Sequence, residues 1–383
     1  MTYFDTVAHA MAAAAASGDT VTMLDNSTEN ITVASGKSVT LDLNGHVLKG
    51  TGSGSRVITL SGSLTLQDSG SSTVHYYVAN DAGPWTWNDN ATGTVTAYES
   101  LTARPKTGDV IAVSGGAITG GNSAEVGGAI LVNSGAVFTM NGGNIVGNKT
   151  QYSNGGALNA TGACTLNSGN ICGNFAGGGS AGQGNGGALY LNGGGSFEMN
   201  GGTMSFNTAN RFGGCATTNS GFTMNGGSIA YNKAVTATGG AFDLGNSTFT
   251  MNSGEIKGNI SSGVGGAMNA YSSTAKIYLL GGSITQNISQ SGGSVNFTNA
   301  QEFKIGGTIV IDDNHLVSDD GTECNLYLAS GKTVSIDSTK PLTGTASVGV
   351  TTYATPTATN PVAVTTAANS ADYSGYQPRR PQA

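Results

Sequence analysis

The sequence predicts an all-β chain: a single-stranded right-handed parallel β-helix, a solenoid of stacked coils with a short N-terminal capping helix. Three observations predict this fold. A block of eleven residues, apolar at its first position and Asn at its last, recurs six times at steps of 25 to 33 residues. A Gly-Gly pair followed by a small residue precedes each copy, and 62 of the 383 residues are Gly. Such frequent Gly indicates many tight corners rather than long helices.

Residues 1–18 are expected to form the capping helix. Asp5 can cap its first turn, the Ala-rich run extends to Ala16, and Gly18 stops it. A cap is needed because an open solenoid end would expose apolar core and unpaired strand edges. Residues 19–69 then alternate apolar and polar side chains between Gly-containing turns, which predicts the first coils.

Residues 70–113 interrupt this rhythm and are predicted to be an insertion. They hold the candidate ligand-binding residues of the chain: Trp85, Trp87, Tyr76, Tyr77 and Tyr98. Exposed aromatic faces stack on sugar rings, and two Trp residues spaced two apart on a strand face the same way. The alternative is a flap whose aromatic residues pack over the side of the coils. This packing interpretation is favoured, because long insertions commonly pack in this way.

Residues 114–340 carry the repeat. In one copy Phe222 and Met224 alternate with Thr223, so the apolar pair is expected to face the core and Thr223 the solvent. Ile229 resumes the inward face after an Asn-Gly-Gly corner, which predicts three short strands per coil. Strands stacked about 4.8 Å apart would place Phe on Phe and Met on Met, in a rod of about eleven coils. Left-handed β-helices need hexapeptide repeats, which the sequence lacks.

The Asn residues of the repeat are predicted to have structural roles. Asn tolerates left-handed backbone at corners, and stacked Asn side chains can hydrogen-bond one another. The Asn that ends each block occupies six positions: Asn148, Asn174, Asn207, Asn232, Asn259 and Asn287. The stretch after this Asn varies most in length, so an exposed loop is expected there. A seventh, degraded copy begins at Phe303 and is interpreted as having Asp312 in place of the Asn.

Residues 341–383 are rich in Thr, Ala and Pro, which predicts a linker or a truncated C-terminal region. The sequence shows neither a signal peptide nor an anchor, and no apolar run approaches the ~18 residues of a membrane span. No membrane insertion by this segment is therefore expected. Because an exported protein should carry a signal, the chain is expected to be a piece of a larger protein.

Charge and cysteine usage narrow the possible partners. The net charge is −7 and the 15 Lys and Arg residues are scattered, so nucleic acid is not expected as a partner. Four cysteines lack C-x-x-C spacing: Cys164, Cys172, Cys215 and Cys324. No metal and no cofactor are predicted from them. Cys164 takes an aromatic position of the repeat and Cys215 an Ala position, so buried free thiols are expected rather than disulfides.

The repeats resemble known families. The Gly-Gly-Ala-(Ile/Leu) block, as in Gly127 to Ile130, alternates with (Ile/Met)-x-x-Asn. This pattern resembles the GGA(I/L/V) and FxxN repeats of polymorphic outer-membrane proteins and related autotransporter adhesins. Residues 18–45 resemble the first coils of large surface proteins of gut bacteria, and the whole resembles the pectin-lyase-like superfamily. The resemblance covers roughly residues 4–340 and implies a parallel β-helix, but its motifs are specific for fold rather than activity.

Catalytic chemistry is weakly indicated. Enzymes of the superfamily that the chain resembles need carboxylates close together on adjacent coils. The carboxylates of the central repeats fall in different columns: Glu198, Asp243, Glu255 and Glu302. Weak catalytic candidates remain in Asp312, Asp313 and His315, but this Asp-Asp pair is more simply a turn. The other histidines, His9, His46 and His75, are expected at the surface or in turns.

These observations favour a non-catalytic bacterial protein, extracellular or on the cell surface, with an adhesin-like function. Its expected partner is a host or environmental glycan or a surface protein. Two alternatives stay open: a polysaccharide lyase or hydrolase of the pectin-lyase-like superfamily, and a fibre like a phage tail spike. The sequence leaves the oligomeric state open.

Overall fold

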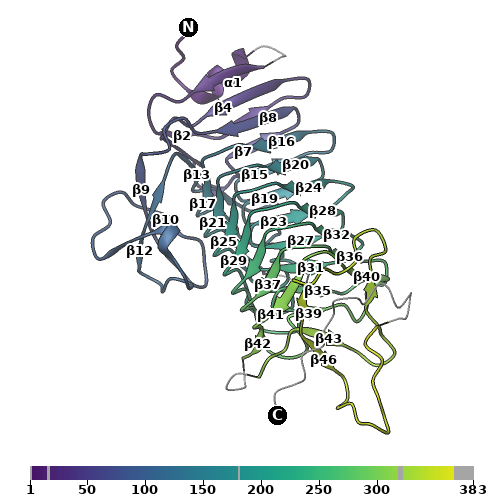
Figure 1. Cartoon of the computed structure of the whole chain (residues 1–383). Coiled ribbons are helices and arrows are strands. Elements are labelled where there is room, and N and C mark those ends of the chain that lie inside the picture. The colour runs from purple at the N-terminus through teal and green to yellow at the C-terminus, as the bar shows by residue number, and fades with distance from the viewer. Residues whose placement is uncertain (1, 15–17, 180–181, 318–321, 366–383) are drawn as a thin grey trace.

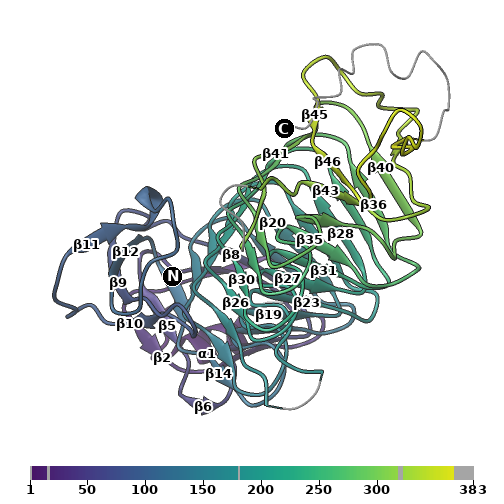
Figure 2. The same ribbon diagram turned by 90° about the horizontal axis from the view of Figure 1, so that it is seen from below.

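The computed structural model describes residues 2–14, 18–179, 182–317 and 322–365 and shows a solenoid of short parallel strands (Figure 1). Successive coils stack along one axis, and a smaller group of strands projects from one side near the N-terminal end. Figure 2 shows the same stack from below, with the projecting strands beside it. The predicted all-β parallel solenoid is confirmed, while its right-handed winding stays a prediction.

Three parallel sheets of eleven strands run along the solenoid, in agreement with the eleven coils expected. Sheet A comprises β1 (Asp19–Thr22), β4 (Ser38–Asp42), β8 (Ser63–Gln67), β16 (Val137–Met140), β20 (Ala163–Leu166), β24 (Ser196–Met199), β28 (Gly221–Met224), β32 (Thr248–Met251), β36 (Lys276–Leu279), β40 (Glu302–Ile305) and β44 (Ser335–Ile336). Sheet B comprises β2 (Ser27–Thr28), β5 (Val47–Lys49), β13 (Ala117–Thr119), β17 (Asn144–Val146), β21 (Asn170–Cys172), β25 (Thr203–Ser205), β29 (Ser228–Ala230), β33 (Glu255–Lys257), β37 (Ser283–Thr285), β41 (Val310–Asp312) and β45 (Ser347–Val348). Sheet C comprises β3 (Ile31–Val33), β7 (Ile58–Leu60), β15 (Ile130–Val132), β19 (Leu158–Ala160), β23 (Leu189–Leu191), β27 (Ala216–Thr218), β31 (Phe242–Leu244), β35 (Met268–Ala270), β39 (Val295–Asn296), β43 (Leu326–Leu328) and β46 (Val350–Thr352).

A fourth sheet corrects the prediction of three strands per coil. Sheet D comprises β6 (Ser53–Gly54), β14 (Asn122–Ser123), β18 (Lys149–Thr150), β22 (Phe175–Ala176), β26 (Thr208–Ala209), β30 (Lys233–Ala234), β34 (Ile260–Ser261), β38 (Ile288–Ser289) and β42 (His315–Leu316). A complete coil therefore runs through sheets A, B, D and C in turn. The sequence assigned these residues to an exposed loop, because two residues are too few to show the alternation that marks a strand.

The core consists of ladders of like side chains. Phe222 in β28 lies between Phe197 and Phe249 on the neighbouring coils, with ring centroids 5.0 and 5.6 Å apart. Phe222 is fully buried, whereas Thr223 on the outer face is partly exposed. Met224 continues a ladder of Met residues in the same register. The predicted alternation of inward and outward residues is confirmed.

The four cysteines are buried free thiols, as predicted. Cys164 lies in register between Phe138 and Phe197, in the aromatic position of the repeat. Burial raises the pKa of the Cys164 thiol to about 12, and a thiol with so high a pKa is a poor nucleophile at neutral pH.

The Asn at the end of each repeat forms a buried ladder, which confirms its predicted structural role. Each side-chain Nδ2 except that of the last member, Asn325, donates to the Oδ1 of the next Asn along the ladder, at 2.8–3.1 Å. The members are Asn148, Asn174, Asn207, Asn232, Asn259, Asn287, Asn314 and Asn325. The left-handed backbone belongs to the residue before the Asn, as in Tyr231 with φ of 55°.

The seventh copy of the repeat is longer than the sequence indicated. Asn314 continues the ladder, and Asp312 pairs in register with Thr285 in sheet B. The interpretation of Asp312 as the replacement of the ladder Asn is therefore wrong. This copy has one residue more than the others, between Ile305 and Val310.

The capping helix α1 (Val7–Ala13) is shorter than the sequence predicts. Thr6, not Asp5, caps it: the Thr6 hydroxyl accepts the backbone N–H of His9 at 3.1 Å. The carboxylate of Asp5 instead contacts Nδ1 of the exposed His9 at 2.6 Å. The expected continuation to Ala16 lies outside the described residues.

Helix α1 closes the N-terminal end of the core, as predicted. The carboxylate of Glu29 accepts the N–H groups of Val7 and Ala8 at 3.0 and 2.7 Å, so the first coil holds the helix at its N-terminus. Met11 is buried in the core cluster of the solenoid.

The insertion forms a sheet of its own, which we call the flap (residues 70–114). Its elements are β9 (Val74–Val78), β10 (Thr86–Trp87), β11 (Val95–Ala97), η1 (Tyr98–Ser100) and β12 (Val110–Ser114), with the strands in the order β10-β9-β12-β11. The flap leaves the solenoid after β8 and rejoins it before β13. Asp68 holds the junction between the flap and the solenoid, since its two carboxylate oxygens accept the N–H groups of Gly45 and Gly116 at 2.7 and 2.9 Å.

The C-terminal region adds to the solenoid within the described residues. The sequence assigned residues 341–383 to a linker or truncated region, yet β45 and β46 extend sheets B and C. The linker interpretation is wrong for these strands, which are too short and Thr-rich for their pattern to be recognised. Residues 366–383 lie outside the described part.

Candidate functional site

The flap packs against the outer face of sheet B, near the residues that precede the ladder Asn. Its buried residues form an apolar cluster with solenoid residues such as Cys172 and Phe206. Tyr77, Trp85 and Tyr98 are only 0, 1 and 7 % exposed. The packing interpretation is confirmed for these three side chains, and their rings offer no free face to a sugar in this arrangement.

Trp85 is the centre of this contact. Its backbone N–H donates to the carbonyl of Gly173 at 2.9 Å, and its ring stacks on Phe206, which stacks in turn on Tyr231. A Cβ on Gly173 would lie 2.4 Å from the indole, so Gly at this corner makes room for Trp85. Phe206 and Tyr231 occupy the same corner position with positive φ, which is unfavourable for bulky residues. The stacking of Phe206 on Trp85, and of Tyr231 on Phe206, offsets this strain.

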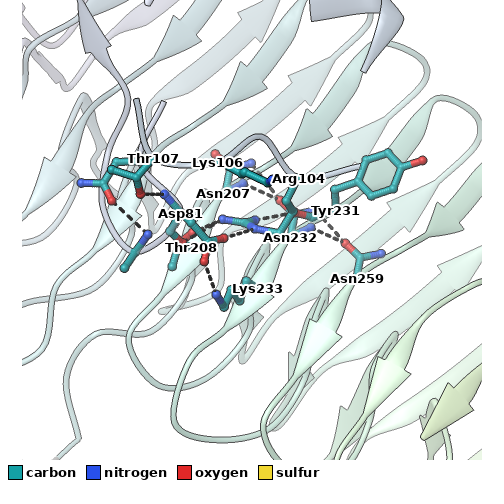
Figure 3. Close-up of polar contacts among 12 residues, drawn as sticks. Asp81, Arg104, Lys106, Thr107, Asn207, Thr208, Tyr231, Asn232, Lys233 and Asn259 are labelled. Carbon is teal, nitrogen blue, oxygen red and sulfur yellow. Dashed lines mark hydrogen bonds and ion pairs between the residues drawn. The ribbon is translucent and has the colours of Figure 1, made fainter. Parts of the chain in front are cut away.

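An ion cluster fastens the same edge of the flap (Figure 3). Arg104 of the flap donates to the carboxylate of Asp81 at 2.9 Å, to the carbonyl of Tyr231 at 2.5 Å and to the hydroxyl of Thr208 at 2.8 Å. Lys233 of β30 binds the other oxygen of Asp81 at 2.5 Å. Burial raises the pKa of Asp81, but the hydrogen bonds from Lys233 and Arg104 outweigh this effect and the pKa lies below its ordinary value.

Trp87 and Tyr76 keep part of their surface in solvent. Trp87 packs against the edge of the flap cluster, and Nζ of Lys49 lies 5.8 Å from its ring centroid. The backbone N–H of Tyr76 donates to Asp89 at 2.9 Å. Since Trp85 is buried, the two Trp residues do not form a shared exposed platform.

His75 is buried, so its predicted place at the surface or in a turn is wrong. Its Nδ1 lies 3.0 Å from the carboxylate of Asp89 and its Nε2 lies 2.9 Å from the carbonyl of Gly45. Both ring nitrogens face acceptors, so His75 links the flap to the second coil through hydrogen bonds.

Asp312 ends β41, Asp313 lies at the corner that follows, and His315 begins β42. The backbone N–H of Asp313 donates to the carboxylate of Asp312 at 3.1 Å, and Asp313 has a positive φ of 54°. The exposed carboxylate of Asp313 lies 2.9 Å from Nε2 of His315. These contacts are those of the predicted turn. The other acidic residues lie in different columns, as predicted: Glu198 and Glu302 in sheet A, Glu255 in sheet B and Asp243 in sheet C.

The structure reveals a row of outward residues that sequence reasoning missed. We call it the outer row of sheet C, and its members stack in register: Thr32, Thr59, Leu131, Asn159, Tyr190, Thr217, Asp243, Asn269, Asn296, Tyr327 and Thr351. Neighbouring members are about 4.8 Å apart along the axis. Part of the signal was present in the sequence, because four members, Asn159, Tyr190, Asp243 and Asn269, each stand between the two apolar residues that follow Gly-Gly-Ala.

Asp243 is the one carboxylic acid of this row. It is 2 % exposed, and one carboxylate oxygen accepts hydrogen bonds from Asn269 Nδ2 at 2.8 Å and from the Thr238 hydroxyl at 2.7 Å. Burial raises the pKa of Asp243 to about 6, against these two hydrogen bonds, which lower it. A carboxyl group whose pKa lies near neutrality is typical of functional sites.

Tyr271 lies beside Asp243 and is 47 % exposed. Its hydroxyl donates to Oδ1 of Asn219, two coils back along the chain, at 2.8 Å. A Cβ on Gly245 would lie 2.3 Å from the Tyr271 hydroxyl oxygen, so the phenol lies directly against this Gly. We call Tyr190, Asn219, Asp243, Asn269 and Tyr271 the C-face patch. It combines the anchored, half-exposed ring of Tyr271 and the partly exposed Tyr190 with the buried carboxylate of Asp243 and the buried amide of Asn269.

A polar cleft lies over the N-terminal end of the same row. It has a volume of about 370 Å³, and Thr32 and Thr59 of the outer row line it. Arg56 and Glu125 form an ion pair at its side, with Arg56 Nη2 2.5 Å from Glu125 Oε2. We call it the N-terminal cleft. The outer row of sheet C runs from this cleft through Leu131 and Asn159 to the C-face patch.

Among the described residues, no cluster of three or more His, Cys, Asp or Glu side chains is arranged to hold a metal ion. No helix in the described ranges combines the length and apolar character needed to cross a membrane. Comparisons with protein-family models, with curated proteins and with solved structures found no match to this chain.

Proposed function

We propose that the chain is a non-catalytic bacterial binding rod, extracellular or on the cell surface, that recognises glycans along the outer row of sheet C. The observation that supports this most directly is the C-face patch. There Tyr271 is held by Asn219 and Gly245 with half of its surface in solvent, next to the hydrogen-bonding side chains of Asp243 and Asn269.

Sugars are amphipathic, and this pair of features matches them. A sugar ring stacks its C–H face on an aromatic side chain while its hydroxyl groups bond to amides and carboxylates at the edge. Because partly exposed members such as Thr59, Tyr190 and Asn296 recur along the outer row, it favours an extended glycan over a single small molecule. Host or environmental glycans therefore fit better than a compact ligand, and a glycosylated surface protein would present the same chemistry.

Two further points support binding rather than catalysis. Glu198, Glu255 and Asp243 lie on three different sheets, whereas glycoside hydrolysis needs two carboxyl groups on either side of one bond. The Gly-Gly-Ala repeats also resemble those of bacterial adhesins, which is the support for a surface location.

The test is a glycan array, followed by affinity measurements on the ligands it identifies. Tyr271→Ala should weaken binding about tenfold, equivalent to about 1.4 kcal/mol, because the stacking face is lost. Tyr271→Phe keeps the ring and should lose much less. Tyr3→Ala is the matched control, because Tyr3 is 72 % exposed and lies outside the row.

The same glycans should be assayed for the release of reducing ends. The proposal expects none. Cleavage by the parent chain that is abolished in Asp243→Asn would show an enzyme instead. Equal affinity of the parent and Tyr271→Ala for every ligand found would overturn the assignment to this face.

A further inference from the structure

We propose that the outer face of the flap binds an amphipathic helix of another protein, one whose apolar stripe is flanked by Lys and Arg. The flap sheet has an inner face that packs on the solenoid and an outer face that points away from it, and the flap projects from the side of the stack (Figure 1). The inference does not depend on glycan binding, because the residues that carry it belong to the flap and not to sheet C.

The register of the flap strands determines which residues share the outer face. In β9, His75 and Tyr77 are buried toward the solenoid, so their neighbours in the strand point the other way. The pairing of β12 with β9 and of β11 with β12 places further residues on the same side. Six accessible apolar side chains of the described flap strands lie on this outer face: Val74, Tyr76, Val78, Val95, Ala97 and Ala112.

An apolar outer face is unusual for this molecule. Val74 and Val95 are 42 and 45 % exposed. On sheet A, by contrast, the outward position is occupied by Thr in most coils, as in Thr139 and Thr165. An antiparallel sheet with one face in water normally alternates apolar and polar residues, whereas β9 reads Val-His-Tyr-Tyr-Val and β12 reads Val-Ile-Ala-Val-Ser. This is the sequence of a sheet that is covered on both faces.

The size of the outer face suits a single helix. Its four strands lie about 4.8 Å apart, and the longest have five residues at about 3.3 Å each, so the face measures about 15 by 17 Å. This area of about 250 Å² is far below the roughly 800 Å² that each partner of a stable dimer buries, so this face alone would not hold two copies together. A helix of three turns, about 16 Å long and about 10 Å wide, covers it.

The charges around the flap favour a partner with basic flanks. Arg104 and Asp81 are engaged with each other, and Asp81 also with Lys233. The remaining charged residues of the flap are three acids and one base: Asp89, Glu99, Asp109 and Lys106. Glu99 follows β11 and Asp109 precedes β12, and both are exposed at the margin of the outer face. A second copy would bring these acids toward like charges, whereas Lys and Arg beside an apolar stripe are complementary to them.

The test uses two helical peptides of about four turns that share one stripe of Leu at positions three and four apart. One peptide has Lys on both sides of the stripe and the other has Glu. Fluorescence anisotropy with the whole chain should show the Lys peptide binding at least about tenfold more tightly than the Glu peptide. Equal binding of the two, or no binding of the Lys peptide up to about 1 mM, overturns the proposal.

A double variant tests the place of binding without changing the charge. Val74→Ser with Val95→Ser removes apolar surface on two strands and should weaken the Lys peptide about tenfold. Val137→Ser is the matched control, because Val137 is 41 % exposed on sheet A, and it should change the affinity by less than about twofold. Melting temperatures identify any variant that misfolds. Equal affinity of the parent and the double variant would place the peptide elsewhere and refute the assignment.

A second pair of variants tests the charges. Glu99→Gln with Asp109→Asn should remove most of the preference for the Lys peptide. Asp25→Asn with Glu198→Gln removes the same charge at exposed positions outside the flap and should retain the preference. If both pairs retain it, the charges of the flap do not select the partner and the proposal fails.

Sedimentation of the parent examines the other occupant. A monomer is expected. A dimer that Val74→Ser with Val95→Ser converts to a monomer would show that a second copy covers the outer face, in place of a helix. Glycan binding is judged separately, because none of these substitutions alters the outer row of sheet C or the C-face patch.

Discussion

A side chain stabilises the solenoid most strongly where it packs against side chains of both neighbouring coils. Phe222 stacks on Phe197 and Phe249, so Phe222→Ala should lower the free energy of unfolding by about 3–5 kcal/mol. Thr223→Ala, one residue away on the outer face, should change it by less than about 0.5 kcal/mol. Thermal and denaturant unfolding of both variants measure the difference. Equal losses in the two would contradict the assigned inward and outward faces.

Asp243 gives the fold a dependence on pH whose sign follows from its pKa. Burial raises this pKa from 3.8 to about 6, so between these values the folded chain keeps a proton that the unfolded chain has lost. Stability should therefore fall as pH rises through this window, by up to about 3 kcal/mol, and then level off. In Asp243→Asn this contribution is absent, so its melting temperature should rise relative to the parent between pH 4 and pH 7. A constant difference across that range would refute the shift.

Unlike the substitution of Asp243, substitution of Asp312 and Asp313 should have little effect on the protein. The double change Asp312→Asn with Asp313→Asn keeps oxygen acceptors of the same shape, and Asn tolerates the positive φ of Asp313. Glycan affinity and melting temperature should both stay close to those of the parent, since an exposed pair such as Asp313 with His315 contributes little. Loss of a polysaccharide-cleaving activity in this variant would show that the chain is an enzyme.

Among the elements, the flap depends on one large side chain. Trp85 is 1 % exposed and packs on Gly173 and Phe206, so changing Trp85 and Trp87 together to Ala should lower the melting temperature clearly. Amide hydrogen exchange should rise through residues 70–114. Trp87→Ala alone is the control and should have a smaller effect, because Trp87 is only partly buried. An unchanged melting temperature with lost glycan binding would instead make the flap a binding site.

An element could be predicted from the sequence where its own residues carry a recognisable pattern, and not where its place depends on residues far away in the chain. Most strands of sheets A, B and C were predictable because three or more residues alternate between an apolar core and solvent, whereas β45 and β46 lack this pattern. Sheet D was not, because its strands have two residues. The docking of Trp85 depends on Phe206 and Tyr231, more than a hundred positions away, which no local pattern connects. The one sign of this contact in the sequence was that Phe206 and Tyr231 precede the ladder Asn, at a position where other copies of the repeat have Gly.

The candidate site was missed for a different reason. Asp243 and Asn269 belong to separate copies of the repeat, and only the register of sheet C brings their side chains within 2.8 Å. Arg56 and Glu125 are 69 residues apart and meet because the flap interrupts the chain between two adjacent coils. Sequence reasoning identified the aromatic insertion instead, since it judged each residue by composition and not by its neighbours on other coils.

At the scale of the whole molecule, the buried Asn ladder couples the coils. Nδ2 of Asn232 donates to Asn259 and to the carbonyl of Met204. Oδ1 of Asn232 accepts hydrogen bonds from the backbone N–H and the side-chain Nδ2 of Asn207. Asn232→Ala leaves these buried groups without partners and should cost about 2–4 kcal/mol. Asn225→Ala breaks a similar amide pair with Asn200 that is exposed, and should cost less than about 0.5 kcal/mol. Equal melting temperatures for the two variants would show that burial of the ladder does not matter.

The ladder also determines how the number of coils in such a chain can change in evolution. Consecutive members from Asn148 to Asn314 are separated by 26, 33, 25, 27, 28 and 27 residues, yet each makes the same side-chain bond. A gene segment that encodes one coil can therefore be duplicated, deleted or exchanged by recombination, and the new neighbours will find matching donors and acceptors. Mutation can lengthen the surface loops independently. Genes that descend from such a gene would encode the same core, while the length of the rod and its surface loops diverge.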